Sequence, residues 1–335
     1  MNPETFQIAC YLPETILTNE QLAAIYPEWN AGKILEKTGI RQRHVCAPDE
    51  CASDLAEQAA KRLFAAGQIA PASIDFVLLA TQTPDYLLPT TACILQHRLG
   101  IPTSAGALDY NLGCSAYVYG LALAKGLLAS GVASNLLLIM AETYSKHIHP
   151  MDKSVRTIFG DAAAATLLTR ATAARIGEFV LGTDGAGASQ LMVPVGGARR
   201  PSAGAACPEI VDESGNIRTD AHLFMNGPDI FAFTIATIPG LVKATLAKNR
   251  LALADIDLFV FHQANKYMLD FLRKKCAIPA EKFFMDMEDC GNTVSASIPI
   301  ALQRAQAKGA LRRGQKVMLV GFGVGLSWGA TVITW

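Results

Sequence analysis

The chain has 335 residues, 51% hydrophobic and 17% charged, a composition that suits a large folded core rather than a disordered chain. Its 29 basic and 29 acidic side chains leave no formal net charge, which argues against a protein that binds nucleic acid by broad neutralisation of phosphates. Eight scattered cysteines without a Cys-x-x-Cys pair argue against a disulfide framework or a structural zinc site and favour a reducing, cytoplasmic compartment.

Short apolar runs alternate with longer amphipathic segments, the pattern of a layered α/β fold. In chain order the pattern predicts a helix over 53–66, a strand over 76–80, helices over 91–99 and 115–130, and strands over 136–140 and 163–168. It then predicts a helix over 231–249, a strand over 258–261, a helix over 266–275 and a strand over 316–321. The glycine- and proline-rich stretch 196–215 is expected to be a surface loop. The apolar runs are of strand length, so we expect no membrane span, and the first twelve residues lack the pattern of a secretory signal.

The two halves of the sequence share an order of elements. Ile-Asp followed by an apolar run opens a strand at residue 74 and again at residue 256. The helix expected to begin at Cys114, with the strand after it, is matched by a helix that begins near Asn292 and the strand over 316–321. This repeated order predicts a duplicated α/β unit, with one half over residues 1–173 and the other over 174–335. Coincidence is the alternative, because α/β proteins often repeat such units.

Cys114 stands between a small-residue turn and a predicted helix. A thiol at a helix N-terminus faces free backbone N–H groups and the positive end of the macrodipole, both of which favour the thiolate. The position therefore suits a nucleophile, although a cysteine in apolar surroundings is more often an inert packing residue.

Two further polar residues stand where α/β folds place working side chains. His262 directly follows the strand over 258–261, where a histidine can stabilise a thiolate, donate to a carbonyl oxygen or move a proton. A buried structural histidine is the alternative. Asn292 follows a glycine and precedes a small-residue helix, where its amide N–H suits a developing enolate oxygen. Asparagine is also a common helix cap, and this plainer role is the alternative.

A glycine-rich turn, Phe-Gly-Val-Gly-Leu-Ser-Trp-Gly over 322–329, follows the strand over 316–321. Glycine lets backbone N–H groups approach a ligand closely, as an oxyanion hole requires. The turn lacks the strand–loop–helix spacing of a phosphate-binding loop, so it does not indicate nucleotide binding.

Taken in order, these motifs resemble ketoacyl-acyl-carrier-protein synthase III, the FabH-like family of thiolase-fold condensing enzymes. The resemblance rests on Cys114, the sequences His-Gln-Ala-Asn at 262–265 and Gly-Asn-Thr at 291–293, and the final glycine-rich turn, with further matches at 11–14, 38–44 and 159–164. It therefore covers nearly the whole chain. It implies an α/β, thiolase-like five-layered αβαβα fold made of two similar halves, and a homodimer.

The resemblance also implies a reaction. Cys114 would take an acyl group from a coenzyme A thioester, and His262 and Asn292 would then hold the carbonyl oxygen of malonyl-CoA or malonyl-acyl carrier protein during decarboxylation. The enolate would attack the acyl-cysteine to give a 3-oxoacyl product. The oxyanion of that attack would be held by backbone N–H groups of Cys114, Gly323, Val324 and Gly325. Neither a metal nor a permanently bound cofactor is implied.

The resemblance also implies substrate contacts at individual positions of this sequence. The residues expected to contact substrate are Trp29, Lys37, Leu88, Lys153, Asn265 and Lys266. Trp29 would stack on the coenzyme, Lys153 stands where an arginine contacts the nucleotide, and Leu88 would cross the dimer interface to the partner's acyl pocket. The basic cluster Arg273, Lys274 and Lys275 is a hypothesis for docking an acidic acyl carrier protein, with a solvated helix face as the alternative.

Two other functions fit the same residues. The acyl group on Cys114 could move to an alcohol or amine without carbon–carbon bond formation, which carbon dioxide release from a malonyl thioester would distinguish from condensation. Alternatively, the chain could be a non-catalytic subunit that pairs with an active partner, against which the intact Cys-His-Asn set argues.

Overall fold

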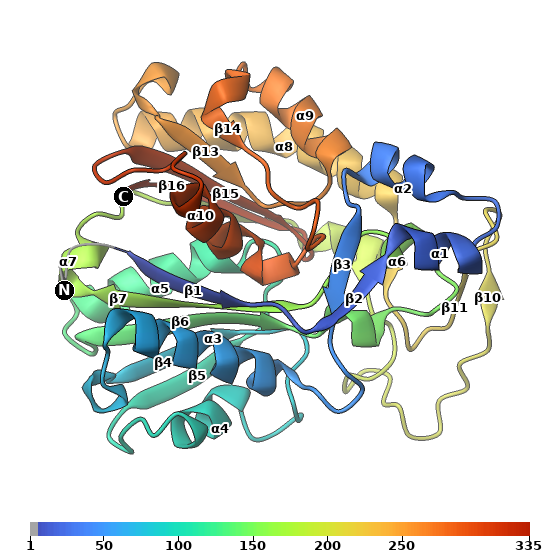
Figure 1. Cartoon of the computed structure of the whole chain (residues 1–335), viewed down its shortest axis with the longest axis horizontal. Helices are drawn as coiled ribbons and strands as arrows, with labels where there is room; N and C mark the ends of the chain where they lie inside the picture. Colours follow the sequence, from blue (N-terminus) through green and yellow to red (C-terminus); the bar gives the residue numbers. More distant parts are fainter. Residues whose placement is uncertain (1–5) are drawn as a thin grey trace.

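The computed structural model describes residues 6–335, which form two five-stranded sheets and three two-stranded ones (Figure 1). The first large sheet has the strand order β1-β7-β6-β4-β5 and the second β14-β13-β15-β16-β8. The first contains β1 (Gln7–Tyr11), β4 (Phe76–Ala80), β5 (Gly106–Tyr110), β6 (Asn135–Glu142) and β7 (Ala162–Thr169). The second contains β8 (Val180–Thr183), β13 (Leu258–Phe261), β14 (Phe283–Phe284), β15 (Lys316–Gly323) and β16 (Ser327–Thr334). The short pairs join β2 (Thr15–Thr18) to β3 (Gln42–Val45), β9 (Leu191–Met192) to β12 (Phe224–Met225), and β10 (Ile210–Val211) to β11 (Ile217–Arg218).

The helices of the described residues are α1 (Asn19–Ile25), α2 (Ala31–Thr38), α3 (Ala52–Gly67), α4 (Thr91–Arg98), α5 (Ala116–Ala129), α6 (Lys153–Arg156), α7 (Arg170–Ala173), α8 (Gly227–Lys248), α9 (Lys266–Lys275) and α10 (Ser297–Ala307). Every helix and strand expected from the sequence is present, with ends moved by at most a few residues. The largest shifts are at α10, expected to begin near Asn292 but beginning at Ser297, and at α8. Helix α8 begins at Gly227 because Asn226 Oδ1 accepts a hydrogen bond from Asp229 N and Pro228 occupies its first turn. The predicted loop over 196–215 is irregular except for β10.

Side-chain alternation along the strands produces the layers. In β4, Val77 and Leu79 pack against α3 and α4, whereas Leu78 and Ala80 point into the middle of the molecule. The second sheet repeats this pattern, because alternate residues of β13 face either the middle layer or α8 and α9. Successive residues of a strand point to opposite faces, so each sheet is buried on both sides. Helices α5 and α10 fill the space between the sheets, and Figure 1 shows the resulting α/β/α/β/α order. The five-layered fold is therefore confirmed.

The two sheets take their strands from different parts of the chain. All strands of the first end by Thr169, and all strands of the second begin at Val180 or later. The boundary predicted between residues 173 and 174 lies between them, at the end of α7. Cys114 precedes α5 and Asn292 precedes α10, so the repeated order of elements puts both residues at the edge of the shared middle layer.

Among residues 6–335, α8 is the one helix long and apolar enough to cross a membrane by length and composition. It packs against β15 and β16 of the second sheet and buries Ile238, Leu241 and Val242 there. Helix α8 is therefore part of the outer layer of the fold, where an apolar stripe is expected.

Candidate active site

Cys114 lies in the loop between β5 and α5, and strand β15 passes directly beneath this loop. A Cβ added at Gly321 would lie 2.8 Å from Ser115 Cα, and one added at Gly323 would lie 2.8 Å from Cys114 Cβ. Only glycine allows two segments to approach this closely. Ser115 Oγ and Ser327 Oγ are 2.7 Å apart, a hydrogen bond that ties the loop to β16. Both halves of the molecule therefore hold the cysteine in place.

Burial dominates the electrostatics of the Cys114 thiol. Desolvation raises the pKa of this thiol, and the nearby charge of Glu142 raises it further, while a backbone N–H lowers it by less. The sequence predicted that the helix N-terminus would favour the thiolate. The structure differs because α5 begins only at Ala116 and desolvation penalises the charged form. The neutral thiol is therefore the resting form at neutral pH.

His262 directly follows β13, and its ring is almost completely enclosed. The backbone N–H of His262 donates to Val320 O at 2.8 Å, which continues the parallel pairing of β13 with β15. The imidazole packs edge-on against the Phe322 ring, with centroids 5.6 Å apart, and its Nδ1 lies 2.7 Å from Ser297 Oγ. Burial lowers the pKa of His262 to about 3, so the imidazole is neutral.

Asn292 is fixed through both its backbone and its side chain. Its backbone forms a bridge to Phe159, and the preceding Gly291 has φ +73, with no room for a Cβ beside Ile158 O. Asn292 Oδ1 accepts a hydrogen bond from Val294 N at 2.9 Å. Because the oxygen is engaged, the amide nitrogen points the other way, and Nδ2 lies 3.4 Å from His262 Nε2. Asn292 therefore closes a local turn and does not cap a helix, because α10 begins only at Ser297 and its N-cap is Ala296. This turn directs the amide nitrogen toward His262.

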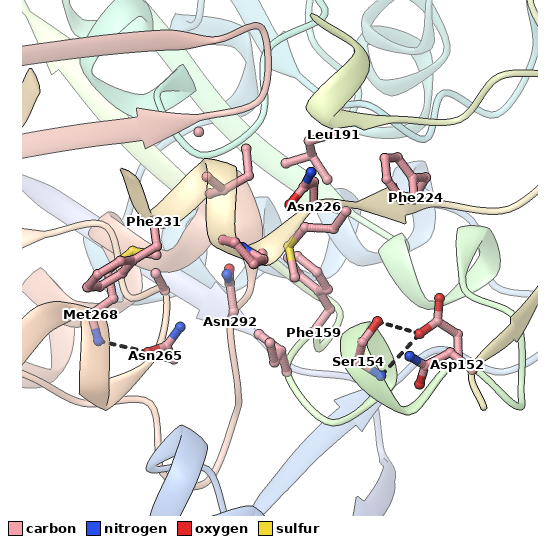
Figure 2. A pocket seen from close by; sticks show the side chains of 18 of the residues that line it. Asp152, Ser154, Phe159, Leu191, Phe224, Asn226, Phe231, Asn265, Met268 and Asn292 are labelled. Carbon is pink, nitrogen blue, oxygen red and sulfur yellow. Dashed lines mark hydrogen bonds between the residues drawn. The ribbon is translucent and has the colours of Figure 1, made fainter. Parts of the chain in front are cut away.

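These three side chains line one cavity of about 1140 Å³. Cys114, His262 and Asn292 are 7%, 2% and 4% exposed, so these three side chains lie in an enclosed part of the cavity. The apolar part of the wall contains Ile158, Phe159, Leu191, Ile230, Phe231, Met268 and Phe322. Figure 2 shows Phe231, Met268 and Asn265 on one side of Asn292, and Asp152 and Ser154 on the other. A cavity of this volume with a mostly apolar wall suits a small-molecule substrate.

The predicted oxyanion turn is only partly at the cavity. Gly323 lines the cavity, and a Cβ added there would lie 3.1 Å from Cys114 Sγ. Val324 and Gly325 do not line it. Val324 packs instead against Gly113, and Gly325 adopts φ +138, a backbone conformation that favours glycine.

Two of the predicted substrate contacts lie at or beside the cavity. Asn265 lines it and caps α9, because its Oδ1 accepts a hydrogen bond from Met268 N at 2.9 Å. Lys153 is buried between two residues that line it and bonds to Glu28 and to Ser214 O. Trp29 and Lys37 are not among the residues that line the cavity. The Trp29 ring lies beneath the ammonium groups of Lys33 and Lys37, 5.7 and 5.1 Å from its centroid.

The remaining predicted contacts lie outside the cavity. Lys266 pairs with Asp270 and lines a second cleft beside Gly39. Leu88 is 83% exposed in the single chain. The basic cluster Arg273, Lys274 and Lys275 ends α9, about 15 Å along the helix from its cavity end. Arg273 donates to Ile278 O, while the two lysines are exposed.

Sequence reasoning missed two polar residues of the site. Glu142 ends β6 and is fully buried, with its oxygens accepting hydrogen bonds from Ser295 Oγ at 2.7 Å and Gln82 N at 3.0 Å. Its position after an apolar strand was a usable signal, the same one that identified His262. Ser297, which contacts His262, carried no such signal. Residues 6–335 contain no group of three or more His, Cys, Asp or Glu side chains placed to hold a metal ion.

Comparisons with known proteins give one consistent result. The family model for 3-oxoacyl-[acyl-carrier-protein] synthase III matches residues 108–185, and the model for the C-terminal part of that family matches residues 246–335. A beta-ketoacyl-[acyl-carrier-protein] synthase III of Caldanaerobacter subterraneus is 37% identical over 330 residues, which cover 97% of this chain and 95% of that protein. A protein of Streptomyces coelicolor with the same description, numbered 3, is 38% identical and covers 97% and 94%.

Solved structures agree with the sequence comparisons. A crystal structure of a 3-oxoacyl-(acyl-carrier-protein) synthase III matches with a TM-score of 0.94 and 54% identity over 98% of both chains. The corresponding synthase of Thermus thermophilus matches with a TM-score of 0.85 and 36% identity, again over 98% of both chains.

Proposed function

The chain belongs to the 3-oxoacyl-[acyl-carrier-protein] synthase III family, and we propose that Cys114, His262 and Asn292 carry out its reaction. It is an acyltransferase that condenses an acyl group from a coenzyme A thioester with a malonyl unit on acyl carrier protein. Transfer to an alcohol or amine is not favoured. The observation that carries the assignment of residues is geometric, because a buried thiol, an imidazole and an amide with its N–H groups turned inward line the enclosed end of one cavity.

In the first half-reaction, Cys114 Sγ attacks the carbonyl carbon of the acyl thioester. The bond to the coenzyme sulfur breaks, and the departing thiolate takes up the proton that the Cys114 thiol loses. Backbone N–H groups around Cys114 hold the transient oxyanion. The contact between Gly323 and Cys114 supports a part for the end of β15 in that oxyanion site. Val324 and Gly325, predicted to share this role, lie farther along the turn.

In the second half-reaction, His262 and Asn292 bind the thioester oxygen of the malonyl group. Loss of carbon dioxide leaves an enolate, and the hydrogen bonds from both residues strengthen as negative charge develops on this oxygen. The enolate carbon then attacks the acyl-cysteine carbonyl, a carbon–carbon bond forms, and Cys114 leaves as thiolate to be reprotonated. The apolar walls, including Phe159 and Phe322, keep water from the enolate.

The proposal extends to partners and location. A homodimer would cover the loop that contains Tyr86, Leu87 and Leu88, which are 62%, 90% and 83% exposed in the single chain. The exposed Lys274 and Lys275 are the proposed contacts for acyl carrier protein. A cytoplasmic location agrees with eight cysteines that all carry free thiols. No resident cofactor is proposed, because side chains and backbone supply every group that the two half-reactions use.

Intact-protein mass spectrometry tests the proposal directly. The protein is mixed with a panel of acyl-CoAs, then with malonyl-CoA or malonyl-acyl carrier protein, while carbon dioxide release is followed. We expect an acyl adduct that is absent in Cys114→Ala, present in the matched control Cys276→Ala, and discharged by the malonyl thioester with release of carbon dioxide. An adduct that survives malonyl thioester but transfers to an alcohol or amine would contradict condensation, and an adduct in Cys114→Ala would contradict the nucleophile.

A further inference from the structure

Ser297 contacts the His262 ring at Nδ1, whereas Asn292 lies at the other ring nitrogen, Nε2. It is the first residue of α10 and is 2% exposed. Its Oγ lies 2.7 Å from His262 Nδ1 and 3.3 Å from the backbone nitrogen of Gln263. These are the two hydrogen-bond partners that the structure shows for this hydroxyl within residues 6–335. The Gln263 N–H can only donate, so it uses a lone pair of Oγ and leaves the hydroxyl hydrogen free.

The hydroxyl hydrogen therefore goes to Nδ1. In the opposite arrangement Nδ1–H and Gln263 N–H would both donate to Ser297 Oγ, and the hydroxyl hydrogen would have no acceptor in a buried site. A buried donor without a partner is costly. A neutral imidazole that accepts at Nδ1 carries its proton on Nε2. We propose that Ser297 is a positioning residue that fixes the tautomer of His262 with the proton on Nε2.

The tautomer decides how many donors the cavity offers. Asn292 Oδ1 is occupied by Val294 N, so Nδ2 presents its hydrogens toward His262 Nε2, 3.4 Å away. With a proton on Nε2, both atoms are donors, cannot bond to each other, and are free to bind one substrate oxygen together. With the proton on Nδ1, Nε2 would accept a hydrogen bond from Asn292. The His262 donor would then be lost and one of the two Nδ2 hydrogens engaged, so the enolate oxygen would lose the paired donors of its site.

This inference rests on the proposed function and sharpens it, because the two half-reactions should depend on Ser297 differently. Attack by Cys114 uses backbone N–H groups for its oxyanion, whereas decarboxylation needs the proton on His262 Nε2. In Ser297→Ala the ring is free to exchange tautomers. We expect decarboxylation of the malonyl thioester to slow by about 10–100-fold, the range for loss of one strong hydrogen bond, with the acylation rate changed by a few-fold at most. Ser297→Thr keeps the hydroxyl and should restore decarboxylation.

Nitrogen-15 NMR of histidine-labelled protein reads the tautomer itself. The chain has six histidines, and comparison with His262→Gln assigns the signals of His262. We expect a pyridine-like Nδ1 and a pyrrole-like Nε2 in the wild type and in Ser297→Thr, and averaged or exchanged signals in Ser297→Ala. The matched control is Ser295→Ala, which removes a neighbouring buried hydroxyl that bonds to Glu142 instead and should leave the His262 signals unchanged.

Two results would overturn the inference. One is a protonated Nδ1 in the wild type. The other is a Ser297→Ala variant whose ring signals and ratio of acylation to decarboxylation rates match the wild type. Failure of the proposed function would look different, since the wild type would then form no acyl adduct on Cys114 while the ring signals still reported the tautomer.

Discussion

The buried carboxyl group of Glu142 should make the stability of this protein depend on pH. Burial raises the pKa of Glu142 from 4.5 to about 8, partly offset by hydrogen bonds from Ser295 and the Gln82 backbone. In the unfolded chain the carboxyl ionises near its ordinary value, whereas in the folded chain it keeps its proton to higher pH. The folded state therefore binds more protons than the unfolded state between these two values.

The sign follows from this difference. A group whose pKa is raised by folding contributes stability that is fully present below its unfolded pKa and is lost as pH rises toward its folded pKa. The contribution falls by about 1.4 kcal/mol per pH unit inside the window and by about 5 kcal/mol across it, an order-of-magnitude value. Glu142→Gln keeps the shape and removes the titration, because its amide can accept from Gln82 N and donate to Ser295 Oγ.

Urea unfolding of the wild type and Glu142→Gln at several pH values between 5 and 8 measures the effect. The free energy of unfolding of the wild type should fall relative to that of the variant as pH rises. Asp109, whose pKa is also raised by burial, is present in both proteins and cancels in the difference. Asp161, whose pKa burial also raises, contributes to the raised pKa of Glu142, so the difference includes the interaction between these two carboxyl groups. The control is Glu57→Gln, since ion pairing with Arg98 and Lys61 leaves the pKa of Glu57 below its usual value and outside the window. A flat difference between wild type and Glu142→Gln would refute the argument.

Three further changes test the site and its support. Gly323→Ala should abolish the acyl adduct seen by mass spectrometry, because its Cβ would lie 2.8 Å from Cys114 Cβ. The control Gly240→Ala, in α8 with no atom within 4 Å of the new Cβ, should form the adduct normally. Equal amounts of adduct in the two variants would contradict the packing argument. Asn292→Asp should form the acyl adduct but lose carbon dioxide release, because a carboxylate repels the enolate; undiminished release would exclude the amide as a donor. Arg43→Ala should lower the free energy of unfolding by about 2–4 kcal/mol, because the fully buried Arg43 guanidinium donates three hydrogen bonds in the wild type. A loss below about 1 kcal/mol in urea unfolding would contradict this role.

The strands that the sequence identified are those buried on both faces by apolar side chains. β4, β6 and β13 are nearly continuous apolar runs, and such runs are typical of strands covered by helices on both sides. β16 escaped prediction because neighbouring side chains pack tightly against its glycine and against the glycine of the adjacent strand β8. A Cβ at Gly329 would come within 2.8 Å of Leu181, and one at Gly182 of β8 would overlap the Trp328 ring. Close packing of this kind favours glycine and serine, which interrupt the apolar run by which a buried strand is predicted.

The features of the site also differ in whether the sequence could predict them. The C-terminal ends of strands and the starts of helices are visible in a sequence, and they marked Cys114, His262 and Asn292. The protonation state of the Cys114 thiol could not be predicted from the sequence, because it depends on how completely the two halves of the fold bury the thiol. The contact between His262 and Ser297 was equally hidden, since it depends on the angle at which α10 approaches the end of β13.

The protonation states of the site favour condensation over transfer to an alcohol or amine. With the tautomer that we propose for His262, the groups proposed to face the reacting atoms would all be donors, namely His262 Nε2–H, the Asn292 amide and the backbone N–H groups near Cys114. An alcohol or amine acceptor must give up a proton as it attacks, and these donors supply no base to receive it. Decarboxylation needs no such base, because carbon dioxide leaves its electron pair behind as the enolate. The acyl transfer onto Cys114 also needs no base from the protein, because the departing coenzyme thiolate accepts the proton of the Cys114 thiol. A neutral histidine with a pKa of about 3 is therefore suited to stabilising an anion and poorly suited to general-base work.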